Sequence, residues 1–211
     1  MRPSSLTDPR PVLKSLLGLL ACVVLAAIVS NYPRYLPPDF TSDFLLGRAD
    51  SFFGAYRWAF YAHLAAGPLS LLLGLVLLSD RLRQRHPAWH RVLGRVQIAV
   101  VLLLLVPSGL WMSASAATGT VAGLGFATLA LATAACATLG WRAAIGRRFA
   151  EHGIWMTRLF ALLSSAVVLR LTSGLANLTG LDADWLYPAS AWVSWLLPLA
   201  ACEVWRVTRR G

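Results

Sequence analysis

Six long apolar segments constrain this chain more than any other feature of its sequence. They cover roughly residues 13–31, 57–79, 93–115, 119–141, 153–175 and 187–205. Each is near the length of about 20 residues that a helix needs to cross a bilayer. Of all residues, 57% are hydrophobic and only 13% are charged, whereas a soluble domain carries about 25% charged residues. The chain is therefore predicted to be an all-α integral membrane bundle of six transmembrane helices, forming one domain over residues 1–211.

The basic residues gather in four regions: before the first apolar segment, between the second and third, between the fourth and fifth, and after the sixth. These regions include Lys14, Arg81, Arg91, Arg147 and Arg209. Cytoplasmic loops of membrane proteins carry an excess of Lys and Arg, so both termini are predicted to face the cytoplasm. The net charge of +10 follows from this topology, and the lipid bilayer, with no nucleic acid, is the predicted partner of the basic residues.

Four ionisable side chains in or beside these segments are candidate functional residues, because charges in a bilayer are costly. His90 and His152 precede the third and fifth segments near the cytoplasmic face, whereas His63 and Arg170 lie nearer the outer face. On a straight helix, 18 residues correspond to five turns and roughly 27 Å. His152 and Arg170 are therefore predicted to share one face of the fifth helix at opposite depths.

The second segment places polar or small side chains at helical spacing, at His63, Gly67, Ser70 and Gly74. Such a stripe is typical of a seam where helices pack closely, and it also suits a groove for a cofactor or substrate. Pro68 lacks a backbone donor and is expected to free the Leu64 carbonyl. The fourth segment has no charged residue and many small ones, which predicts close helix packing.

Three stretches and one later residue resemble a known family in their order and spacing. They are HLAAGPLSLLLG at 63–74, HPAWHRVLGR at 86–95, EHGIWMTRLFAL at 151–162, and Arg170. Together they resemble the bacterial membrane protein family called domain of unknown function 2306, over about residues 50–175. The resemblance implies a multi-pass protein of the bacterial inner membrane, in which His63, His90, His152 and Arg170 belong to the family pattern. It implies no established activity.

One hypothesis for the function is electron transfer through b-type haem. His90 and His152 would be the ligands of the haem iron, because haem accepts histidines from facing helices and arginines pair with its propionates. His63 and Arg170 would then form a separate outer site, for a quinone or a second haem. On this hypothesis, any enzymatic activity would be that of a membrane oxidoreductase, although an enzyme is not the leading expectation.

Two alternatives need no haem. In the first, the protein is a transporter or a membrane protein that binds a small molecule or lipid, with His63 and Arg170 forming a polar site in the outer half. Histidine suits such a site because its ordinary pKa lies near about 6.5. In the second, the protein is an accessory subunit of a larger membrane complex, with other membrane proteins as its partners.

Overall fold

Helices make up the fold in the computed structural model, which describes residues 9–42, 45, 48–116 and 119–208. No strand occurs in these residues. The helices are α1 (Pro9–Ser30), η1 (Tyr32–Arg34), α2 (Ala49–Phe52), α3 (Tyr56–Leu77), α4 (Asp80–Arg85), α5 (Pro87–Val100), η2 (Val101–Leu105), α6 (Val106–Ser113), α7 (Thr120–Ile145), α8 (Phe149–Leu163), α9 (Ser165–Thr179) and α10 (Leu186–Thr208). The predicted all-α class is thus confirmed for the part of the chain that the structure describes.

Four stretches of helix are long and apolar enough to cross a membrane. They are Tyr56–Leu77, Pro87–Ser113, Thr120–Ile145 and Phe149–Thr179. They correspond to the second through fifth predicted segments. The first and sixth segments also form helices, α1 and α10, but neither belongs to this set among the described residues. The tryptophans, serines and prolines of α10 lower its mean hydropathy, so six crossings remain a prediction.

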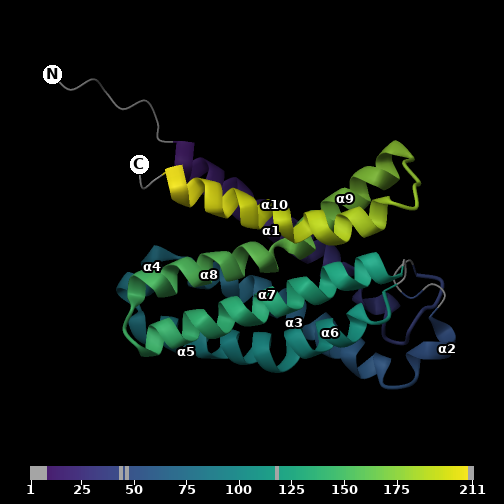
Figure 1. Cartoon of the computed structure of the whole chain (residues 1–211), viewed down its shortest axis with the longest axis horizontal. Helices are drawn as coiled ribbons and strands as arrows, with labels where there is room; N and C mark the ends of the chain where they lie inside the picture. The colour runs from purple at the N-terminus through teal and green to yellow at the C-terminus, as the bar shows by residue number, and fades with distance from the viewer. Residues whose placement is uncertain (1–8, 43–44, 46–47, 117–118, 209–211) are drawn as a thin grey trace.

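The long helices form a bundle in which α3, α7, α8 and the α5–η2–α6 series run along the long axis (Figure 1). Helix α7 packs between α6 and α8, and α10 packs on α7 and α8. At one end of the bundle lie α4, the α7–α8 turn and the described ends of α1 and α10 (Figure 1). The turns that follow α1, α6 and α9 lie at the opposite end.

Small residues bring α7 close to its neighbours. Ala130, Thr133, Ala137 and Gly140 are buried at helical spacing along α7. A Cβ added at Gly140 would lie only 2.1 Å from Cε of Met156 and 3.2 Å from Cβ of Trp155, both on α8, so the two helices are in close contact at that point. The close helix packing predicted for the fourth segment is therefore confirmed.

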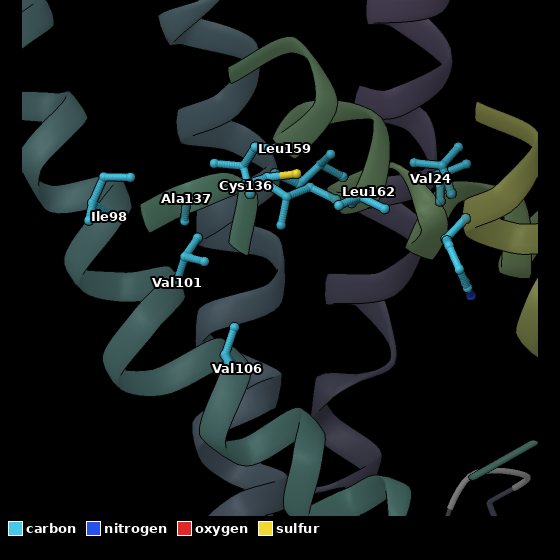
Figure 2. Close-up of a cluster of buried hydrophobic side chains, with 12 residues drawn as sticks. Val24, Ile98, Val101, Val106, Cys136, Ala137, Leu159 and Leu162 are labelled. Atoms are coloured by element: carbon cyan, nitrogen blue, oxygen red, sulfur yellow. The ribbon is translucent and has the colours of Figure 1, made fainter. Parts of the chain in front are cut away.

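The apolar core joins all the long helices of the bundle. Figure 2 shows Ile98, Val101 and Val106 along the α5–η2–α6 series, near Ala137 of α7 and Leu159 of α8. Val24 of α1 is buried in the same cluster. Helix α10 contributes Trp195 to it and is also tied to α8 by an ion pair between Arg158 and Glu203, with Nε and Oε1 2.6 Å apart. The core therefore extends from the four membrane-length stretches to both flanking helices.

Two of the predicted helices are interrupted. The third contains one π-helical stretch, η2 (Val101–Leu105), which ends two residues before Pro107. The fifth breaks into α8 and α9 at Ser164, whose hydroxyl donates to the Ala161 carbonyl at 2.7 Å, and α9 leaves the line of α8 (Figure 1). The prediction of one straight fifth helix, with His152 and Arg170 on a common face, is therefore wrong. Local bonding of serine to the backbone competes with a continuous helix and bends it.

An aromatic cap covers the end of the bundle opposite α4. It consists of Tyr35, Leu45, Phe52, Tyr56 and Phe60, which form a second buried cluster separate from the main core. Phe52 is 1% exposed, and its ring lies 5.5 Å from that of Phe40 and 5.6 Å from that of Phe60. The loop after α1 is therefore a packed part of the fold.

Candidate functional site

A cavity of about 340 Å³ lies inside the bundle, next to the aromatic cap. Helices α1, α3, α6, α7, α9 and α10 all contribute to its wall, as does the loop after α1. Most of the lining side chains are apolar. Among the candidate residues, His63 from α3 and Arg170 from α9 line this cavity, and His90 and His152 do not. The structure therefore divides the four candidates into two pairs.

The hydrogen bonds of His63 indicate which of its ring nitrogens carries the proton. Its Nδ1 lies 3.2 Å from Oγ of Ser108, and the Ser108 hydroxyl donates its proton to the Leu104 carbonyl at 2.6 Å. Ser108 must then accept, so Nδ1 of His63 carries the proton and Nε2 is an acceptor. The Nδ1 and Cε1 atoms of the ring lie next to α6 at Gly109.

The contact with His63 lies just after the break in the third membrane-length stretch. Oγ of Ser108 lies 2.6 Å from the Leu104 carbonyl and 3.1 Å from the Leu105 carbonyl. Thr133 makes the same kind of bond to the carbonyl four residues earlier in α7, which is unbroken. The remaining acceptor capacity of Ser108 faces His63, so this contact joins α3 to α6.

A second proline changes the backbone hydrogen bonds of α3. Pro68 lies inside α3, and the hydroxyl of Tyr32 donates to the Leu64 carbonyl that Pro68 leaves free. The predicted release of this carbonyl is confirmed, and the structure identifies its partner. Burial raises the pKa of the Tyr32 phenol above its ordinary value, with a smaller contribution from Tyr35. Tyr32 therefore remains a neutral donor at neutral pH and ties the loop after α1 to α3.

Arg170 is exposed and lines the cavity from α9. It interacts electrostatically with the hydroxyls of Tyr32 and Tyr187. The ion pairs among the described residues are Arg83–Asp80, Arg148–Glu151, Arg158–Glu203 and Arg206–Glu203. Arg170 therefore has no carboxylate partner in this part of the chain. Asp182 and Asp184, which the sequence makes available near the outer face, do not pair with it.

The stripe of small residues on α3 serves both of the roles that its sequence suggested. His63, Gly67 and Ser70 line the cavity, and a Cβ added at Gly67 would meet nothing within 4 Å. At Gly74 a Cβ would lie 2.9 Å from Cδ2 of Phe160 on α8. The part of the stripe nearer the cap is therefore a groove, and the part nearer α4 is a helix-packing seam.

The second pair lies near the end of the bundle that holds α4. The rings of His90 and His152 interact electrostatically, and Nδ1 of His152 donates to the Gly140 carbonyl at 2.9 Å. Nδ1 of His90 is buried and has no hydrogen-bond partner among the described residues. Arg158, expected beside a haem propionate, is instead paired with Glu203. Direct contact of the two histidines, and their binding of a cofactor, stay predictions.

The described residues contain no group of three or more His, Cys, Asp or Glu side chains placed to hold a metal ion. Two axial histidines on a haem would not form such a group. The arrangement of His152, with Nδ1–H on a carbonyl, leaves its Nε2 available as a ligand. His90 has no equivalent partner for its Nδ1. Only His152 therefore has the hydrogen bond that orients a histidine ligand of a haem iron.

The sequence analysis missed three polar residues of the cavity wall. Tyr32 and Tyr187 line it from opposite ends of the chain, and Arg48 reaches it from the loop before α2. Arg48 donates from Nη1 to the Ser115 carbonyl at 2.8 Å and lies 5.2 Å above the Tyr56 ring. The concentration of aromatic residues between positions 32 and 61 was the available signal for a packed loop.

Comparison with known proteins identifies one family. The model described as "Predicted membrane protein (DUF2306)" matches residues 60–206. The match extends through α10, beyond the expected end near residue 175. The search of the curated proteins and the search of the solved structures found no match.

Proposed function

Since the chain belongs to the family of predicted membrane proteins with domain of unknown function 2306, we propose that it binds a small amphipathic molecule inside the membrane bundle. One observation carries the proposal: His63 from α3 and Arg170 from α9 line a single cavity with apolar walls. Small-molecule sites are typically apolar clefts of about 300–1,000 Å³ with a few polar groups that orient the ligand. The volume and the lining of this cavity agree with that description.

The polar groups of the cavity favour a ligand over a purely structural role. His63 is the histidine of the cavity wall, and Arg170 lines the same wall without a carboxylate partner among the described residues. A ligand with a hydrogen-bonding head and an apolar body would match these polar groups and the apolar walls. A quinone has this chemistry and is one ligand class that we propose.

We further propose that the protein resides in the bacterial inner membrane with the α4 end toward the cytoplasm. The support is the distribution of arginine: α4, the α7–α8 turn and the end of α10 hold Arg81, Arg83, Arg85, Arg147 and Arg206. These elements lie at one end of the bundle (Figure 1). Basic residues are enriched on the cytoplasmic side of membrane proteins. Transport of the ligand and a place in a larger membrane complex are extensions of this proposal.

The binding proposal is tested with Gly67→Leu, because the new side chain would enter open space on the cavity face of α3. The wild type, purified in a steroid-based detergent without acyl chains, is expected to carry a bound amphiphile in native mass spectrometry. Gly67→Leu is expected to bind it at least about fivefold more weakly, since overpacking costs roughly 1–3 kcal/mol.

Gly94→Leu is the matched control. Gly94 also has open space around its Cβ position, and it does not line the cavity. It should keep the adduct. Equal occupancy in all three proteins would contradict binding in this cavity. If Gly67→Leu does not fold, Ala166→Leu, on the α9 wall, replaces it as the blocking variant.

A b-type haem held by His90 and His152 is a second candidate function, favoured by the buried, unpartnered Nδ1 of His90 and the electrostatic interaction of His90 with His152. Purification from haem-supplemented cells should then give a protein whose reduced-minus-oxidised spectrum shows a Soret shift and sharp α and β bands. His90→Ala and His152→Ala should each abolish these bands, because each removes an axial ligand. A wild-type protein without haem absorbance under these conditions would rule out this candidate.

A further inference from the structure

The charge of the cavity wall indicates the chemistry of the ligand's head. Two arginines, Arg48 and Arg170, line the cavity, and no Asp or Glu does so among the described residues. Arg48 is engaged with the Ser115 carbonyl and the Tyr56 ring. Arg170 has no carboxylate partner in the same part of the chain. A positive wall without acidic residues suits an anion.

His63 and Arg170 line one cavity from different helices. Tyr32 lies near both walls. Its hydroxyl donates to the carbonyl of Leu64, the residue after His63, and its side chain interacts electrostatically with Arg170. A histidine on α3 and a cation on α9 thus belong to the same cavity wall. The rest of the wall is largely apolar and includes Leu71, Leu162 and Leu163.

We propose that the ligand is a single-chain carboxylic acid, with its head between Nε2 of His63 and the guanidinium of Arg170. The proposal rests on the binding function above and specifies its ligand class. The apolar chain lies along the leucine-rich part of the cavity. The volume of about 340 Å³ is near the lower limit for small-molecule sites, about 300 Å³, which favours one chain over a two-chain lipid.

In the proposed complex one proton moves from the acid to His63. The acid's O–H proton passes to Nε2 of His63, the O–H bond breaks as the N–H bond forms, and the products are a carboxylate and an imidazolium. The pair has no net charge, and Arg170 donates hydrogen bonds to the carboxylate oxygens. Hydrogen bonds between charged groups are stronger than neutral ones, so the acid should bind more tightly than an alcohol of equal chain length.

The test compares dodecanoic acid with dodecanol as probes, in the steroid-based detergent. Apparent affinities come from the dependence of the unfolding temperature on probe concentration, because a ligand that binds only the folded state stabilises it. The wild type is expected to bind the acid about tenfold more tightly than the alcohol, since a hydrogen bond to a charged group contributes about 1.5–3 kcal/mol. Arg170→Gln should remove this preference by weakening only the acid.

Arg34→Gln is the control, because Arg34 is exposed and lies outside the cavity wall; it should keep the preference. If Arg170→Gln does not fold, Arg170→Lys keeps a charge without the planar fork and should keep part of the preference. Equal affinities for acid and alcohol in the wild type would overturn the carboxylate head while leaving the cavity as an amphiphile site. Absence of stabilisation by either probe, with a native adduct still present, would overturn the acid and its chain but not binding.

Discussion

Replacing Phe52 by alanine is expected to lower the free energy of unfolding by about 3–5 kcal/mol, the range for truncating a buried Phe. Phe52 is 1% exposed and is the central ring of the aromatic cap. Its neighbours include Phe40, Phe60 and Tyr61, with ring centroids 5.5 to 5.9 Å away. These contacts are lost together, and the cap can refill the space only in part. Thermal unfolding in detergent measures the effect.

Phe53→Ala provides the matched control for Phe52→Ala. Phe53 is adjacent in sequence and is of the same residue type, but it is 59% exposed. Its removal should cost less than about 1 kcal/mol, since exposed substitutions usually have small effects. Equal decreases in the free energy of unfolding of the two variants would contradict a stabilising role for the burial of Phe52. Limited proteolysis of the loop before α3 would locate the damage, with faster cleavage expected in Phe52→Ala alone.

Replacing Gly140 by leucine is expected to cost about 1–3 kcal/mol or more, as is usual for overpacking in a filled core. The added Cβ alone would lie 2.1 Å from Cε of Met156 and 3.2 Å from Cβ of Trp155. Met156 has a flexible end that can move aside, whereas Cβ of Trp155 moves only with the backbone of α8. The substitution must therefore separate α7 from α8. It should also lengthen the bond from His152 to the Gly140 carbonyl.

The unfolding temperature of Gly140→Leu is compared with that of Gly94→Leu. Gly94 lies in α5, and its Cβ position is open. Leucine is a better helix former than glycine by up to about 1 kcal/mol, so Gly94→Leu should be neutral or slightly stabilising. A Gly140→Leu protein as stable as Gly94→Leu would contradict tight contact between α7 and α8.

The two proline residues in membrane-length helices illustrate how far local sequence reasoning extends. Pro68 predicted a free carbonyl at Leu64, because a missing N–H is a property of the residue itself. The donor that uses this carbonyl, Tyr32, lies 32 residues away in the chain. No periodicity links these positions. Likewise, Pro107 lies beside the π-helical stretch, but the contact between Ser108 and His63 depends on the packing of α6 against α3.

The candidate residues were identified by their cost in a bilayer, and their grouping was only partly predictable. His63 and Arg170 line the same cavity, whereas their similar depth in the membrane stays a prediction. The common face expected for His152 and Arg170 failed, because helical phase assumes an unbroken helix and Ser164 interrupts it. The lining of the cavity by Tyr187 was missed because α10 folds back on the bundle.

Composition and charge alone determined that this is a helical membrane protein, that its long apolar segments form helices, and that one end is basic. These properties follow from local hydropathy and from the arginine-rich turns, which need no knowledge of neighbouring segments. Only the tertiary structure decided that α3 and α9 share a cavity, that aromatic residues after α1 pack into a cap, and that His90 and His152 lie outside the cavity. Such features depend on which side chains pack together across the bundle, and packing is a property of the whole chain.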